Sequence, residues 1–164
     1  MAKQPGAEGL PVAVIPSIPT RDQQLKAEPL IGADDRALLR VGIELFDAGE
    51  FWEAHERWET IWQRESRPIR SFYQGLIQIA AAYHHWTVTH RPKGVELGIA
   101  KGIEKLTWYR PEYLGVDLAK MIDEAEHMRA SAAGHDAAWL AAFPIAELPH
   151  IPQIDATSAA EPPR

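Results

Sequence analysis

Two stretches of the sequence combine histidine, glutamate and glutamine at helical spacing. In the first, His55 and Glu59 are four residues apart, so their side chains can touch on one face of a helix. In the second, Gln78 and His85 are seven residues apart, which is close to two helical turns. Imidazole and carboxylate groups are common general acids, bases and metal ligands, so these four residues are candidates for proton transfer or for binding a small polar ligand.

Each of the four residues has an expected role. His55 is the general base or ligand, Glu59 orients it, His85 is a second base or ligand, and Gln78 presents an amide to the substrate. A metal site of His55, Glu59 and His85 is a weaker alternative, because neither H-E-x-x-H nor paired Glu-x-x-His motifs are present. The same side chains could instead satisfy one another as a purely structural network.

The helices expected to carry these residues form a hairpin. Residues 51–64 place His55 within an apolar arc that contains Trp52, so we expect this histidine to be largely buried. Residues 68–87 are apolar nearly all round, except for a polar seam that includes Gln78 and His85. The short connection predicts antiparallel packing, and the sequence leaves open whether the seam faces the first helix. His84 is expected on the helix surface and His90 in a solvated loop.

Prolines and apolar periodicity predict an all-α fold, a compact bundle of about five helices without a sheet. The other helices are expected over residues 36–47, 93–109 and 116–131, with one possible helical turn over 136–142. Residues 1–33 are expected to be a mobile or extended tail, 34–132 the helical domain, and 133–164 an extended C-terminal tail. The spacing of glycine, alanine and tryptophan also resembles two tetratricopeptide (TPR) hairpins.

Composition excludes several classes of function. The 164 residues carry a net charge of −6, which argues against binding to nucleic acid or to an anionic membrane surface. The absence of cysteine removes disulfides and thiolate chemistry, and no apolar run is long enough to span a membrane. We therefore expect a cytoplasmic protein. Nothing in the sequence identifies a cofactor or an oligomeric state.

Two blocks of sequence carry a resemblance to a known family. The run FDAGEFWEAHERWETIW over residues 46–62, followed by GLIQ over 75–78 and an alanine-rich turn to His85, resembles the prokaryotic domain-of-unknown-function 309 family. The resemblance implies a compact all-α fold and no established activity. Residues 87–94 depart from it, because the family more often has a shorter basic turn there. By motif position, the polar residues of the family correspond to His55, Glu56, Glu59, Trp62, Gln78 and His85.

Two hypotheses of different kinds follow. In the first, His55, Glu59, Gln78 and His85 line a pocket that binds a small polar ligand or supports acid–base or metal-assisted hydrolysis. In the second, these residues only stabilise the fold, and a tryptophan-rich groove on a non-catalytic scaffold binds a partner protein.

Overall fold

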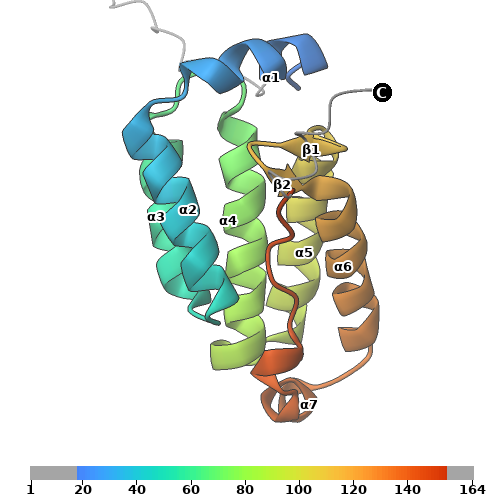
Figure 1. Cartoon of the computed structure of the whole chain (residues 1–164). Coiled ribbons are helices and arrows are strands. Elements are labelled where there is room, and N and C mark those ends of the chain that lie inside the picture. The colour runs from blue at the N-terminus through green and yellow to red at the C-terminus, as the bar shows by residue number, and fades with distance from the viewer. Residues whose placement is uncertain (1–17, 155–164) are drawn as a thin grey trace, which may run out of the picture.

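The computed structural model describes residues 18–154, and these residues form a helical bundle with one small sheet (Figure 1). In chain order the elements are α1 (Arg21–Ala27), η1 (Glu28–Leu30), α2 (Ala33–Asp47), α3 (Phe51–Arg64), α4 (Arg70–His84), η2 (His85–Thr89), α5 (Pro92–Thr107), β1 (Glu112–Tyr113), β2 (Val116–Asp117), α6 (Leu118–Ala132), α7 (Ala137–Ala142) and η3 (Ile145–Glu147).

Helix α4 lies at the centre of the bundle. It packs against α3 on one side and α5 on the other, while α2 packs on α3 and α6 packs on α5 (Figure 1). Because α4 has neighbours on both sides, its sequence is apolar nearly all round, and Phe72, Leu76 and Tyr83 are almost fully buried. The all-α fold class predicted from the sequence is confirmed at this level, whereas the TPR likeness stays a prediction.

Glycines set the distance between α4 and α5. A Cβ at Gly102 would lie 2.6 Å from the Ile79 side chain and 3.0 Å from the Gly75 carbonyl oxygen. A Cβ at Gly98 would lie 2.8 Å from the Cβ of Ala82. Real Cβ atoms do not approach other atoms this closely, so the two helix backbones can come together only because side chains are absent here.

A second close approach joins α2 to α3. Trp58 is fully buried, and its indole nitrogen donates a hydrogen bond of 3.2 Å to the Leu39 carbonyl oxygen. The ring lies over Gly42, where a Cβ would be only 2.1 Å from the indole nitrogen. The absence of a side chain at residue 42 therefore decides whether the largest buried ring of α3 can reach α2.

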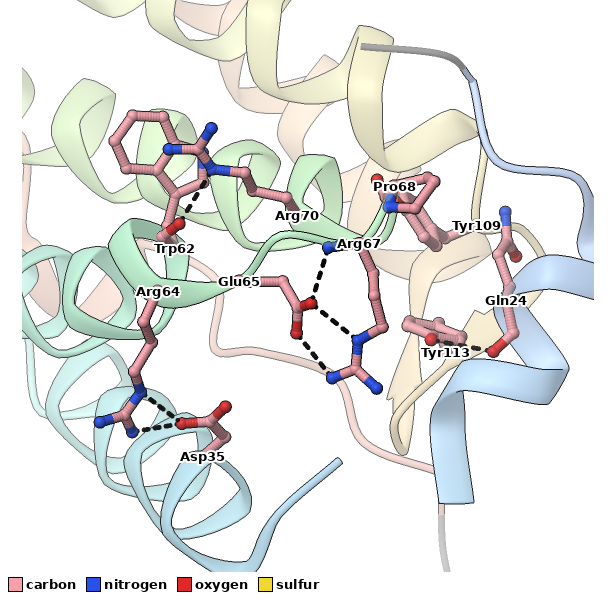
Figure 2. A network of polar contacts seen from close by, with 10 residues as sticks. All are labelled: Gln24, Asp35, Trp62, Arg64, Glu65, Arg67, Pro68, Arg70, Tyr109 and Tyr113. Atoms are coloured by element: carbon pink, nitrogen blue, oxygen red, sulfur yellow. Dashed lines mark hydrogen bonds and ion pairs between the residues drawn. The ribbon is translucent and has the colours of Figure 1, made fainter. Parts of the chain in front are cut away.

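The connection between α3 and α4 contains a buried ion pair (Figure 2). The side chain of Glu65 is 4% exposed and accepts hydrogen bonds from the backbone N–H and the guanidinium of Arg67. Burial alone would raise the pKa of Glu65, but the hydrogen bonds from Arg67 together lower it below its usual value. The negative charge is thereby retained inside the turn that reverses the chain.

The amino-terminal stretch expected to be mobile or extended contains the helix α1 followed by η1, so the expectation is wrong for residues 21–30. Thr20 and Gln23 form a capping box at the start of α1. Gln24 is fully buried, its amide donates to the Trp108 carbonyl oxygen at 2.6 Å, and its own carbonyl oxygen accepts from the Tyr113 hydroxyl at 3.0 Å. These contacts attach α1 to the body of the protein.

The expectation that the bundle contains no sheet is wrong, because one two-stranded sheet is present. Glu112 pairs with Asp117 and Tyr113 with Val116 in an antiparallel two-stranded sheet. Gly115, with a φ of +79°, turns the chain between them. The sequence predicted helix from residue 116, whereas α6 begins at Leu118, with the Asp117 side chain as its N-cap. A two-residue strand is too short to show alternation in a sequence.

Residues 143–154 run along the bundle without long regular structure and return to the sheet (Figure 1). Leu148 and Ile151 are buried, and the Ile151 backbone N–H donates to the Asp47 carboxylate at 2.7 Å. Val116 forms an isolated bridge with Gln153. Residues 1–17 and 155–164, on which part of the expectation about the tails falls, lie outside the described residues.

Helix α4 ends earlier than the sequence predicts. It stops at His84 and continues as the π-helical turn η2, after which His90 adopts a left-handed conformation with a φ of +52°. No helix among residues 18–154 is long and apolar enough to cross a membrane.

We expect Gly42→Ala to lower the free energy of unfolding by about 1–3 kcal/mol, because the new methyl group would displace the buried Trp58 ring. Gly32→Ala is the control, since a Cβ at Gly32 meets no atom within 4 Å; we expect it to cost less than about 1 kcal/mol. Urea unfolding followed by circular dichroism measures both variants. Equal losses would contradict the packing argument.

Candidate functional site

The edge of α3 next to α4 carries a histidine, a carboxylate and an aromatic ring in contact. His55 Nδ1 lies 3.7 Å from a Glu59 carboxylate oxygen, one helical turn further on. The Trp52 ring stacks on the His55 ring, with 4.6 Å between centroids and 11° between planes. As the sequence predicts, His55 is largely buried, with 15% of its side chain exposed, whereas Trp52 is 44% exposed rather than inside the apolar arc.

His55 is held in a state that favours the neutral imidazole. Burial lowers its pKa, nearby His84 lowers it further, and Glu59 and Glu56 oppose this effect without reversing it. The Nδ1 atom of His55 is buried and has no hydrogen-bond partner among the described residues. Such an atom is uncommon in a folded protein, because an unpaired buried polar group costs about 1–3 kcal/mol.

His84, which the sequence analysis placed on the helix surface without a role, is the histidine of α4 that approaches this edge. Its ring centroid is 5.0 Å from that of Trp52, and its charge is one of the influences on the pKa of His55. The Trp52 ring is therefore close to both imidazoles. His84 points toward α3 because α4 packs against α3 along the same stripe of residues, which includes Ala80.

Gln78 and His85 lie on the part of α4 next to α5, about 100° around the helix from His84. Lys105 of α5 donates a hydrogen bond to the Gln78 amide oxygen at 3.0 Å. The His85 ring covers Gly94 of α5, where a Cβ would lie 2.7 Å from the ring, and its Nδ1 is 2.7 Å from the Thr89 hydroxyl. Burial lowers the pKa of His85, and His84 and Arg91 add to that shift.

The structure therefore divides the four predicted residues into two pairs. His55 and Glu59 face the side of α4 that carries His84, and Gln78 and His85 contact α5 instead. Among residues 18–154 no three histidine, aspartate or glutamate side chains are arranged to hold a metal ion, so the predicted trio of His55, Glu59 and His85 does not form a metal site. The roles assigned to the individual residues stay predictions.

Trp52 and His84 were given no part in the site by the sequence. Trp52 was expected inside the apolar arc of its helix and His84 on the helix surface, and only the rotation of α4 about its axis decides which of its residues meet α3. The adjacent pair His84 and His85 did indicate that either histidine could approach α3. Neighbouring residues of a helix point about 100° apart, so one histidine can face α3 while the other faces α5. His90 is half-buried rather than solvated, with Nδ1 2.9 Å from the Trp86 carbonyl oxygen.

Comparison with known proteins identifies the segment that carries this site. Residues 39–97 match the family model described as domain of unknown function DUF309. The match is confined to this segment, which is similar to the DUF309 family. The family predicted from the sequence blocks is thereby confirmed. No curated protein and no solved structure matches the chain significantly.

The DUF309 segment contains both pairs of polar residues. It runs from the middle of α2 through α3, α4 and η2 into the first turns of α5. Lys105, the partner of Gln78, lies beyond its end, and so do α6 and the C-terminal segment. A cavity of about 150 Å³ lies between α5 and α6, and one of about 340 Å³ lies beside residues 145–150. Neither cavity is lined by a residue of the two pairs.

The environment of His55 can be tested by its titration. We expect the pKa of His55 to lie below its usual value of about 6.5, and Trp52→Ala to raise it by admitting water to the ring. Because the folded state binds the proton less tightly than the unfolded state, His55 should make the protein less stable as the pH falls through 6.5.

The measurement is a nuclear magnetic resonance titration of the His55 ring. Trp139→Ala is the matched control, since Trp139 stacks on His135 in the same way at a site outside the DUF309 segment. A His55 pKa at or above 6.5 in the unmodified protein would show that burial does not control this group.

Proposed function

We propose that the protein is a helical interaction module that binds a folded protein partner through one side of the α3–α4–α5 layer. We call this side the open face. It consists of residues that are all half-buried or exposed: Trp52, Glu56, Glu59 and Gln63 of α3, Gln74, Gln78, Ala81 and His85 of α4, and Leu97, Lys101, Lys105 and Trp108 of α5.

The exposed apolar side chains at the two margins of the open face carry the proposal. Trp52 on α3 is 44% exposed and Leu97 on α5 is 47% exposed, although both helices have a well-buried apolar side that faces the core. Exposed tryptophan is characteristic of the residues that contribute most to protein interfaces. Apolar groups at both margins of a broad polar face indicate a partner that covers the whole layer.

The distribution of charge indicates what kind of partner fits. The α3 margin carries Glu56 and Glu59, the α5 margin carries Lys101 and Lys105, and the α4 residues between them are uncharged apart from the titratable His85. Nucleic acid would be repelled by the α3 carboxylates. A protein surface with an acidic and a basic margin of its own complements the open face.

The proposal predicts site-specific cross-linking in the cells that express the protein. With the photoreactive substitution Leu97→p-benzoylphenylalanine, we expect irradiation to give one discrete protein adduct. The same substitution at Ile145 is the control, because Ile145 is 53% exposed but lies against Gly49, away from the open face. Denaturing electrophoresis and mass spectrometry detect and identify the adduct.

The adduct at residue 97 should also disappear when Trp52→Asp is added, since that change places a charge at the opposite margin. No adduct at residue 97, or equal adducts at 97 and 145, would contradict the proposal.

One observation favours a second candidate function, acid–base chemistry at the edge of α3. Among residues 18–154 the Nδ1 atom of His55 has no hydrogen-bond partner, the pKa of His55 is lowered toward the neutral base, and Glu59 lies within 3.7 Å to stabilise a positive charge. These are the properties of a general base or nucleophile, and His84 could act as the second group in place of His85. Trp52 would form one wall of such a site.

Hydrolysis of p-nitrophenyl acetate tests this second candidate. We expect His55→Gln to lower the second-order rate constant by about tenfold or more, and the rate of the unmodified protein to rise with pH and level off above the His55 pKa. His127→Gln is the control, since His127 is an exposed histidine of α6. If the two variants react at the same rate, His55 has no special reactivity.

A further inference from the structure

We infer that the partner bound by the open face is a second copy of this chain, arranged with α3 of each copy opposite α5 of the other. The inference rests on the proposed function and names its partner. A twofold axis that lies in the interface and runs parallel to α4 produces this arrangement. The two α4 helices then face each other along the axis.

The arrangement brings opposite charges together at the correct height. Trp52 contacts His84 near the end of α4, and the neighbouring His85 covers Gly94 of α5, so residues 52 and 94 lie at the same level of the layer. Helices α3 and α5 run in the same direction from this level, since α4 is antiparallel to both. At about 1.5 Å per residue, Glu59 is therefore level with Lys101.

Rotation about an axis parallel to α4 leaves the position of every residue along that axis unchanged. Each residue of α3 therefore lies opposite the residue of α5 in the second copy that has the same position along the axis. Glu59 of one copy then faces Lys101 of the other, and Glu56 and Lys105 lie within about one helical turn of that pair. At the end nearest His84, Trp52 and Leu97 lie within about one helical turn of each other across the interface. The twofold axis repeats each contact, so both margins of the open face are matched at once.

Three of the four charges involved have no ion-pair partner within residues 18–154, and the fourth, Glu59, lies 3.7 Å from His55 Nδ1. The ion pairs in that range include neither Glu56 nor Lys101 nor Lys105. Lys105 is partly buried, which lowers its pKa, and in the described residues it has only the neutral amide oxygen of Gln78 as a hydrogen-bond acceptor. Carboxylates of the second copy would restore favourable surroundings for this ammonium group.

The residues on α4 suit a position on the twofold axis. A residue on such an axis meets its own counterpart, so a charged residue there would repel itself. Gln74 and Gln78 carry amides that both donate and accept hydrogen bonds, and Ala81 leaves room for close approach. The alternative axis, perpendicular to α4, would set the acidic margin of α3 against the same margin of the second copy, which like-charge repulsion disfavours.

Charge reversal on the two margins tests the arrangement by sedimentation equilibrium at low salt. We expect the unmodified protein to have twice the 18.3 kDa mass of one chain. The double variants Glu56→Lys/Glu59→Lys and Lys101→Glu/Lys105→Glu should each raise the dimer dissociation constant at least tenfold, because every contact between margins becomes repulsive. Lys120→Glu on α6, at an exposed residue away from the open face, should leave it unchanged.

The decisive result is the equimolar mixture of the two double variants. In a mixed dimer the lysines now on α3 of one chain face the glutamates now on α5 of the other, and the remaining pairs are also opposite, so we expect the dimer to return. Circular dichroism of each variant alone confirms that it is folded. A mixture that stays monomeric would overturn the arrangement, and so would reversals that leave the dimer intact.

The outcomes separate this inference from the proposed function. An unmodified protein that is monomeric at about 1 mM, the range of very weak association, overturns the second copy as partner. If residue 97 then still cross-links to a different protein, the interaction module stands with another partner. If residue 97 gives no adduct, both fail.

Discussion

The close packing of α4 between α3 and α5 is the constraint on which the rest of the structure depends. Helix α4 can be central only because α5 approaches it over glycines, where an added methyl group at residue 98 or 102 would meet neighbouring atoms at 2.6 to 2.8 Å. Helix α3 in turn is held against α2 by the buried Trp58 ring over Gly42. Two layers of helices follow from these contacts, because the apolar sides of α2 and α6 cover the remaining core.

The same packing determines what becomes of the polar residues. Once the glycines of α5 lie against α4, the side chain of Gln78 contacts Lys105 and the ring of His85 covers Gly94. The neighbouring stripe of α4, which contains His84, is then the one that meets α3. His55 and Glu59 consequently face a different histidine from the one their spacing had indicated, and the Trp52 ring shields them from solvent on one side.

The polar network at the opposite end of the bundle has a different part in the fold. Glu65 and Arg67 stabilise the turn between α3 and α4, and the bonds of Gln24 to Trp108 and Tyr113 join α1 to the end of α5 and to the small sheet (Figure 2). The Tyr109 hydroxyl bonds to Ser71 of α4. This bond between the two hydroxyls links a residue inside the DUF309 segment to the residues that follow α5.

The sequence by itself determined the helices, the family and the burial of His55, because apolar periodicity and the two sequence blocks are local properties of the chain. It could not determine the rotation of α4, the attachment of α1 through Gln24, or the two-residue strands near Gly115. Each of these depends on contacts between residues far apart in the chain, such as the bond from Gln24 to Trp108. Only the tertiary structure decided that His84 rather than His85 approaches His55, since two adjacent residues of a helix differ by about 100° and a local pattern cannot tell which of them meets the neighbour.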